Sequence, residues 1–312
     1  MPQPACAVDC RSLAVGSTAY GQMAFQQGQI LISAYLYLVS LKRRLEGVVP
    51  PSLMERVPTS FEIIGSRGGA VAVVEIPEEL EEYKYEIARA ITAANKHVKA
   101  VLRKLGGRTG DYRLYNFEVL IEGPTEVLHK EHGYYIKVDP TKVYFSSRDQ
   151  TDRLDVAKKV GEGERVLYLF AGVGPYAIAI AKFARPKLIV AVELNPWGFK
   201  SMVENFKINN IKNAVAVHGD VAAVAPLLRG KFDRVLMTLP LGAYKYLPLA
   251  FQCLERGGVV HFYQLGREED PYRDAEEIVK NICPDCQIIG KRIVRDYAPG
   301  VYKVRVDVYK PP

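Results

Sequence analysis

Residues 165–176 read RVLYLFAGVGPY, and this stretch decides the fold of the C-terminal half. The apolar run at 165–169 predicts a strand, and Pro175 opens the helical pattern that follows it. Gly172 and Gly174 let the intervening backbone approach a ligand, and the helix start offers free N–H donors. The same letters fit the loose GxGxxA motif of nicotinamide enzymes, or a plain tight turn between strand and helix.

Downstream of this motif, apolar strands alternate with amphipathic segments of helix length. This alternation predicts an α/β domain with a doubly wound parallel sheet. Two final strands, joined by a short turn, predict an antiparallel hairpin that closes the sheet. Such a hairpin is typical of Rossmann-like class I methyltransferases, which use S-adenosylmethionine (AdoMet), and unusual for dinucleotide dehydrogenases. The predicted strands are 165–169, 188–192, 214–218, 234–237, 258–263, 287–294 and 301–309.

Two carboxylates follow successive strands of this sheet. Glu193 ends the second strand, where it could accept hydrogen bonds from the ribose hydroxyls of an adenosine in either AdoMet or NAD. Asp220 follows the third strand, where the amino group of an adenine would lie, and it also fits the N-cap of the next helix. The pair favours AdoMet. We therefore expect the cofactor to contact these residues: Phe170, Gly172, Gly174, Glu193, Asp220 and Thr238.

The fourth strand ends in Thr238-Leu-Pro240. In methyltransferases that act on amino groups, this turn presents hydrogen-bond acceptors to the target. Thr238 supplies only a hydroxyl, and Pro240 shapes the turn. We expect both residues in the catalytic site, although a plain loop is the alternative.

The N-terminal half has a different pattern. A hairpin at 61–76, a helix at 77–95 with acids in its first turn, and strands at 112–121 and 133–138 predict a smaller α+β domain. A helical pattern at 29–46 ends before Pro50-Pro51, and the first 25 or so residues have no clear period. The predicted divisions are an extension with a small helical region at 1–57, an RNA-positioning domain at 58–148 and a catalytic domain at 149–312.

Composition narrows the function classes. The 312 residues carry a net charge of +7, which favours a polyanionic partner. We see neither a membrane-spanning run nor a secretory signal, so we expect a cytoplasmic protein, working as a monomer. The five cysteines make no disulfide framework, and for Cys283-Pro-Asp-Cys286 we favour a local disulfide over a structural metal.

The chain as a whole, from about residue 41 to 310, resembles the archaeal and eukaryotic tRNA (guanine-37 N1) methyltransferases and the related wybutosine-pathway aminocarboxypropyl transferases. No single motif is specific, but together they are. The resemblance rests on these segments: FEIIG (61–65), VLRK (101–104), GDYR (110–113), TEVLHKEHG (125–133), KVYFSSRDQTDR (142–153), FAGVGPY (170–176), ELNP (193–196), GGVVHFY (257–263) and YAP (297–299).

The resemblance implies AdoMet as cofactor and the anticodon loop of tRNA as substrate. It places Arg113 where the family has a catalytic arginine, and Asp152 near its general base, normally a glutamate. A carboxylate would accept the N1 proton of guanine, and a guanidinium would stabilise the charge that develops on O6. From the residues alone, Asp152 would be an ion-pair partner of Arg153, and Arg113 a solvated or phosphate-binding side chain.

Besides Asp152 in place of a glutamate, the sequence departs from the family pattern at three places. Ser147 replaces a proline, Thr238 replaces an asparagine, and Gly-Val-Tyr after Pro299 resembles the aminocarboxypropyl transferases. The leading alternative is therefore transfer of the 3-amino-3-carboxypropyl group of AdoMet to a tricyclic guanosine. A non-catalytic RNA-binding protein and a nicotinamide oxidoreductase are weaker alternatives.

A basic stretch between 96 and 113 predicts the RNA-binding surface. Its cations far outnumber its one acid, Asp111, and Gly106-Gly107 would let backbone approach a phosphate. A solvated basic face is the alternative. The residues that we expect to contact RNA are Lys99, Arg103, Lys104, Arg108 and Arg148.

Overall fold

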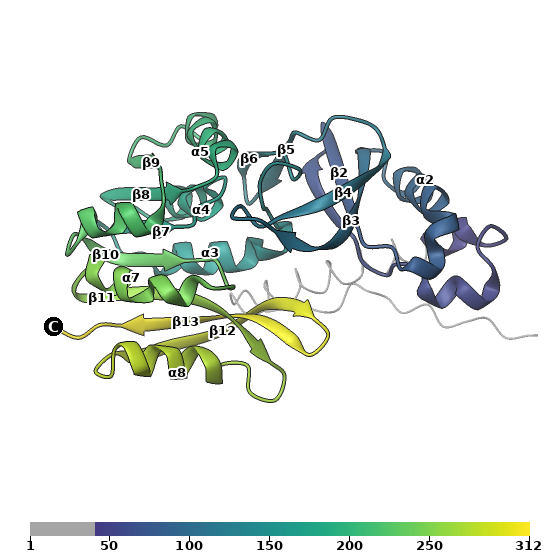
Figure 1. Ribbon diagram of the computed structural model, residues 1–312. Coiled ribbons are helices and arrows are strands. Elements are labelled where there is room, and N and C mark those ends of the chain that lie inside the picture. The colour runs from purple at the N-terminus through teal and green to yellow at the C-terminus, as the bar shows by residue number, and fades with distance from the viewer. Residues whose placement is uncertain (1–40) are drawn as a thin grey trace, which may run out of the picture.

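The computed structural model describes residues 41–312. The helix predicted at 29–46 lies outside these residues except for 41–46, of which 41–45 are helical, and Cys6 and Cys10 also lie outside them. The chain forms two sheets that lie side by side, with a two-stranded hairpin packed between them (Figure 1).

The C-terminal half is built on a seven-stranded sheet of order β12-β13-β11-β10-β7-β8-β9. The five strands from β11 to β9 are parallel, and β13 runs antiparallel to both β11 and β12. This topology confirms the predicted α/β fold with a closing hairpin. The strands are β7 (Arg165–Leu169), β8 (Leu188–Glu193), β9 (Ala214–His218), β10 (Phe232–Met237), β11 (Leu254–Arg267), β12 (Gln287–Ala298) and β13 (Val301–Tyr309).

Helices cover both faces of this sheet because its strands are apolar on both sides. In β7, Val166 and Tyr168 pack with α3 and α4, whereas Leu167 and Leu169 pack with α7 on the opposite face. The helices are α3 (Gln150–Lys159), α4 (Pro175–Phe183), α5 (Pro196–Ile208), α6 (Val221–Val224), α7 (Leu247–Cys253) and α8 (Arg273–Ile282), with short 3₁₀ turns η3 (Ser147–Asp149), η4 (Ala225–Leu228) and η5 (Ala243–Tyr246).

The N-terminal half is a four-stranded sheet of order β1-β2-β3-β4. Its elements are η1 (Pro51–Arg56), β1 (Glu62–Ser66), β2 (Gly69–Val74), η2 (Glu78–Tyr83), α2 (Lys84–Ala94), β3 (Val98–Thr109) and β4 (Leu114–Ile121). The helix predicted at 77–95 therefore begins as a 3₁₀ turn. Most of the basic stretch, which we assigned to no element, is strand β3, and its apolar side chains are buried on both faces of the sheet, Leu102 in one core cluster and Val101 in another.

The hairpin of β5 (Val127–Glu131) and β6 (Tyr134–Val138) joins the two halves. Only β6 was predicted. One apolar cluster runs from Val71 and Val73 in the N-terminal sheet, through Ile136 of the hairpin, to Tyr168 in the C-terminal sheet. This shared core fixes the loops of the N-terminal half over the edge of the large sheet.

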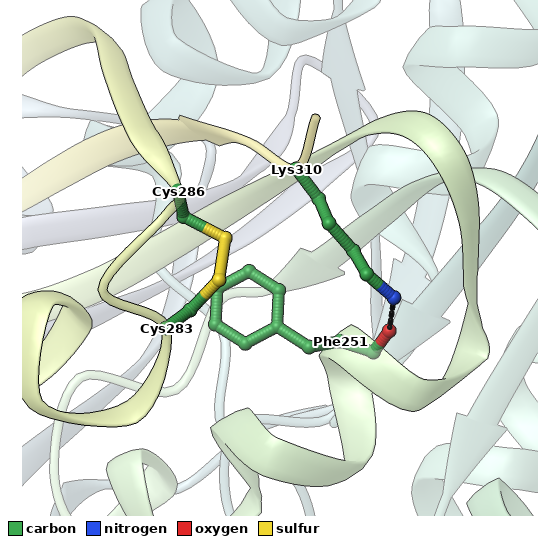
Figure 2. The surroundings of a disulfide bond; sticks show 4 residues. All are labelled: Phe251, Cys283, Cys286 and Lys310. Atoms are coloured by element: carbon green, nitrogen blue, oxygen red, sulfur yellow. Dashed lines mark hydrogen bonds between the residues drawn. A yellow bond between two sulfur atoms is a disulfide. The ribbon is translucent and has the colours of Figure 1, made fainter. Parts of the chain in front are cut away.

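Cys283 and Cys286 form a disulfide just after α8, beside the ring of Phe251 (Figure 2). The predicted local disulfide is therefore confirmed. Within residues 41–312, no group of three His, Cys, Asp or Glu side chains is placed to hold a metal ion. No helix in that same range is both long and apolar enough to cross a membrane.

Gly174 offers a direct test of the close packing behind the glycine loop. Its φ is +80°, and a Cβ there would lie 2.8 Å from Cγ of the buried Met202. We expect Gly174→Ala to lower the free energy of unfolding by about 2–4 kcal/mol, the sum of a left-handed backbone and a steric clash. Urea denaturation of the purified protein measures this.

Gly163→Ala is the matched control, since Gly163 also has φ +80° but has open space at its Cβ position. We expect it to cost only the backbone strain, about 1–2 kcal/mol. Equal losses in the two variants would contradict the packing argument.

Candidate functional site

The candidate site lies at the carboxyl ends of the parallel strands, where ligands bind in open α/β sheets. Leu169 pairs with Val192 of β8 on one side and with Met237 of β10 on the other. The loops that follow β7, β8 and β10 are therefore neighbours. Phe170 itself has φ +60°, an uncommon conformation for a residue with a side chain, and its ring contacts Tyr246 edge-on.

The loop after β7 is hydrogen-bonded to Glu193, the last residue of β8. The Glu193 carboxylate accepts hydrogen bonds from the backbone N–H of Gly172 (2.6 Å) and of Asn195 (2.8 Å). Burial raises the pKa of Glu193 above its usual value, and these backbone donors oppose the rise only in part. A carboxylate fixed in this way can accept further hydrogen bonds from a pair of ribose hydroxyls.

Asp220 is exposed and caps α6, since its carboxylate accepts a hydrogen bond from the backbone N–H of Ala222 (2.8 Å). The N-cap alternative is thus confirmed, and the capping does not exclude contact with a ligand, because each carboxylate oxygen can accept two hydrogen bonds. Asp220 and Glu193 line the same cavity.

The cavity that Glu193 and Asp220 share has a volume of about 730 Å³ and is the larger of two cavities at this edge of the sheet. It brings together most of the expected cofactor residues, namely Phe170, Gly172, Glu193 and Asp220, with residues from the turn between β3 and β4. Gly174 does not line it and packs behind the loop instead. The cavity is large enough for a nucleoside with a second aromatic ring system beside it.

Arg113 reaches the larger cavity from the N-terminal half. Its backbone has φ +52°, in the turn after β3, and its N–H donates to the carbonyl of Gly110. A Cβ at Gly242 would lie 3.1 Å from Nη2 of Arg113, so the glycine makes room for the guanidinium. The structure therefore places a cation from the N-terminal half at the carboxyl ends of the strands in the C-terminal sheet.

A smaller cavity of about 70 Å³ lies beneath the larger one and shares Phe170, Gly172 and Leu239 with it. Thr238 and Pro240 line this smaller cavity, as do Tyr168 and Tyr176. The expected catalytic turn thus faces the glycine loop.

Asp152 does not line either cavity, contrary to our expectation. Its side chain is 1% exposed, and its carboxylate accepts hydrogen bonds from Arg305 (2.5 Å), Tyr176 (2.7 Å) and Tyr263 (2.5 Å). Its contact with the site runs through the hydroxyl of Tyr176. Arg153, the partner that we weighed for Asp152, pairs with Glu131 instead.

Sequence reasoning missed Asp149 and Lys303, which both line the smaller cavity. Lys303, Arg305 and Asp307 alternate with valines along β13, and all three are buried. Charges at every second position of an apolar strand are the signal that could have revealed a buried polar face.

The expected RNA-binding residues fall into two groups. Arg108 and Arg148 line a third cavity of about 630 Å³ between the two halves, and Arg148 is exposed. The guanidinium of Arg108 stacks over Tyr144 at 4.1 Å, and its buried Nε has no hydrogen-bond partner. Both cations are therefore available to a phosphate or a base.

Arg103 and Lys104 do not fit the expectation as well. Arg103 is buried and pairs with Glu81 and Glu118, because β3 turns its side chain toward η2 and β4. Lys104 pairs with Glu75 and lies over the ring of Tyr115. Lys99 is exposed, with its ammonium bonded to the carbonyl of Lys96.

Comparisons with known proteins match most of the chain to one family. Residues 127–289 match the family described as the TRM5/TYW2 methyltransferase domain, and residues 41–125 match the TYW2 N-terminal domain. A relative from Pyrococcus abyssi, tRNA (guanine(37)-N(1))-methyltransferase Trm5b, is 41% identical over 264 residues, 83% of this chain and 77% of that protein.

Two solved structures have the same fold. One, of aTrm5 in complex with tRNALeu, has a TM-score of 0.76 and 31% identity, and the match covers 87% of this chain and 78% of that one. The other, of M. jannaschii TYW2 in complex with AdoMet, has a TM-score of 0.61 and 26% identity, covering 81% and 100%. The match to each extends over both halves of the chain.

The Glu131–Arg153 pair beneath the site gives a pH prediction. Burial alone raises the pKa of Glu131, but Arg153 and His129 lower it to about 2. Because this is below the unfolded value of 4.5, the pair stabilises the fold above pH 4.5, and the gain is lost as pH falls toward 2. We expect Glu131→Gln to cost about 3 kcal/mol at pH 7 and almost nothing at pH 2.

Urea denaturation at several pH values measures the difference between wild type and variant. Glu126→Gln is the control, because Glu126 makes an exposed ion pair with Lys137, and it should change stability by less than about 0.5 kcal/mol throughout. A pH-independent difference for Glu131→Gln would contradict the titration argument.

Proposed function

Because the chain belongs to the TRM5/TYW2 methyltransferase family, we propose that it forms N1-methylguanosine at position 37 of tRNA, with AdoMet as the cofactor. The observation that carries this proposal is the shared cavity: Glu193 and Asp220, suited to an adenosine, open onto the same space as Arg113, suited to a purine that becomes anionic. Such an enzyme must take the target base out of its stack, and the cavity has room for both.

The residues fit the cofactor. Glu193 would accept both ribose hydroxyls, Asp220 would lie at the adenine, and the glycine loop from Phe170 to Gly172 would lie against the sulfur-bearing arm. When bound, AdoMet supplies a methyl group, whose carbon–sulfur bond breaks as the bond to N1 of guanine forms. The Gly172 and Asn195 amides keep Glu193 oriented before the ligand arrives.

Arg113 would act on the guanine itself. As the N1 proton departs, negative charge builds on O6, and a guanidinium at the cavity wall stabilises it most strongly where water is excluded. Thr238 and Pro240 would shape the floor of the base site. Gly242 keeps the space that Arg113 needs.

The route of the N1 proton is less direct than the family pattern implies. Asp152 is buried behind Tyr176, whose hydroxyl donates to it and whose ring lines the smaller cavity. We propose that the hydroxyl oxygen of Tyr176 accepts the N1 proton while its own proton passes to the Asp152 carboxylate, so that Asp152 is the final base. Arg305 would keep that carboxylate in place.

For the RNA we propose Arg108 and Arg148 as the main contacts, with Lys99 as an outer phosphate contact. The aromatic rings around Arg108 give a surface on which bases can stack. In this proposal residues 58–148 position the tRNA, and residues 149–312 carry the chemistry. Because the proposed substrate is tRNA, we expect the protein to act in the cytoplasm. That the protein is a monomer stays a prediction.

Transfer of the 3-amino-3-carboxypropyl group is the second candidate. It is favoured by the match of residues 41–125 to the TYW2 N-terminal domain and by Gly-Val-Tyr at 300–302. Against it stands the 41% identity to a guanine-N1 methyltransferase.

Mass spectrometry of digested tRNA separates the two reactions. We expect incubation with AdoMet and a tRNA carrying guanine 37 to add one methyl group to that nucleoside. Glu193→Ala protein and a tRNA with adenine at position 37 should both give no product. An aminocarboxypropyl adduct on tRNA that carries the tricyclic guanosine, without methylation of guanine, would assign the second reaction instead.

Arg148→Glu tests the RNA surface. Because Arg148 is exposed at the third cavity, we expect its reversal to weaken tRNA binding at least tenfold, about 1.4 kcal/mol, without changing AdoMet affinity or thermal stability. Filter binding and calorimetry measure the two affinities.

The matched control is Arg185→Glu. Arg185 is also exposed but precedes β8, at the opposite end of the sheet. If both reversals weaken tRNA binding equally, the effect is one of net charge, and Arg148 has no local role.

A further inference from the structure

Two asparagines on one face of α5 form hydrogen bonds with the outer edge of strand β6. The side-chain amide of Asn205 accepts from the N–H of Lys137 (2.6 Å) and donates to the carbonyl of Lys137 (3.0 Å). Asn209, about one turn further along, makes the same two contacts with the backbone of Tyr135, at 2.9 and 2.6 Å. Each amide thus takes the place of a residue on a neighbouring strand.

The rise of a helix and the rise of a strand make this pairing possible. Four residues of an α-helix rise about 6 Å, and two residues of a β-strand rise about 6.7 Å, so side chains at 205 and 209 meet alternate residues of β6. Within residues 41–312, β6 pairs with β5 alone, so the backbone groups on its other edge need partners. The two amides supply those partners at Tyr135 and Lys137.

Asn205 differs from Asn209 in one further contact. Its Nδ2 also donates to the carbonyl of Val173, in the glycine loop, at 3.0 Å. Asn205 and Val173 are both fully buried. The extra hydrogen bond of Asn209 goes instead to the carbonyl of Asn205, within α5, at 2.8 Å. Of the two asparagines, Asn205 alone therefore connects β6 with the loop after β7.

The Val173 carbonyl belongs to a peptide group that shapes the glycine loop. The N–H of the same peptide, on Gly174, donates to the carbonyl of Ala171 at 2.9 Å. The Val173 carbonyl precedes the first backbone acceptor of α4, which is Gly174, so the regular hydrogen bonds of that helix do not reach it. Asn205 supplies the donor, and the peptide is held at both ends.

We propose that Asn205 is a positioning residue for the cofactor: it holds the glycine loop in its ligand-binding shape and links that loop to the hairpin between the two halves. The inference rests on the proposed function and adds to it a fully buried residue that lines neither cavity of the site. Through Val173 it acts on Gly172, whose N–H orients the Glu193 carboxylate. Its other bonds reach β6, whose Ile136 belongs to the core shared by both halves.

An asparagine side chain suits this role because it offers one acceptor and two donor hydrogens in one plane. Here the oxygen accepts the Lys137 N–H, and Nδ2 donates to one carbonyl on each side, those of Lys137 and Val173. An ionised aspartate has nearly the same shape but no donor, so an oxygen would face both carbonyls. Asn205→Asp therefore removes the link and keeps the size of the side chain.

Hydrogen exchange of the wild-type protein tests the link without any variant. The probe is S-adenosylhomocysteine, and individual backbone amides are followed by NMR. Because a bound nucleoside suppresses local opening of the glycine loop, we expect exchange of the Lys137 amide to slow at least about fivefold and that of the Tyr135 amide less than about twofold. Equal slowing at the two amides, or none at Lys137, contradicts the proposal.

Asn205→Asp extends the test, with Asn209→Asp as the matched control on the same helix. We expect Asn205→Asp to bind S-adenosylhomocysteine about tenfold more weakly and the control to change by less than about twofold, in calorimetry at a temperature where circular dichroism shows both to be folded. A loss of stability alone does not change the affinity of folded protein. Unchanged affinity in Asn205→Asp, or an equal loss in both variants, therefore overturns the positioning role.

The two measurements distinguish this link from the proposed function. Wild-type protein that binds no S-adenosylhomocysteine overturns the proposed function itself. Wild type that binds it and leaves the Lys137 amide unprotected overturns the link alone, and the proposed function stands. The exchange measurement decides even where Asn205→Asp does not fold.

Discussion

The structure depends on a buried network of charges between α3 and the closing hairpin. Asp149 pairs with Lys303, Asp152 with Arg305, and Asp307 with both Arg305 and His261. Removing one partner of such a pair leaves a buried charge uncompensated, at a cost of about 3–5 kcal/mol. Because α3 directly follows the segment that connects the two halves, these ion pairs fix the smaller cavity relative to the N-terminal half.

Sequence reasoning predicted the C-terminal sheet well because its strands are short apolar runs separated by helix-length segments. This pattern can be recognised from the sequence without knowing which strands pair. It did not predict that Asp152 is buried, because a motif gives residue order and not depth. Asp149 stands at the start of α3, at the cavity, whereas Asp152 lies about one turn further along, where Tyr263 and Arg305 surround it. The packing of α3 on β11 and β13 decides which of these two carboxylates lies at the cavity, and the sequence alone does not give that packing.

The N-terminal half shows why formal charge does not identify a binding surface. The basic stretch contains the buried apolar residues Val98 and 100–102, most of it forms strand β3, and its cations therefore point to both faces of the sheet. Arg103 therefore meets Glu81 and Glu118 and is neutralised locally, whereas Arg108, past the bulge in β3, is stacked among tyrosines. Pairing across the sheet, which sequence alone does not give, separates structural cations from available ones.

The candidate site contains features that lower the stability of the ligand-free protein. Phe170 and Arg113 have a left-handed backbone, and the half-buried carboxylate of Glu193 accepts hydrogen bonds from backbone amides. A left-handed backbone costs a non-glycine residue stability, and the Glu193 carboxylate keeps lone pairs that the hydroxyls of a nucleoside would use under the proposed function. Left-handed residues and a carboxylate with spare acceptor capacity therefore lie close together at this edge of the sheet, where ligands bind in open α/β sheets.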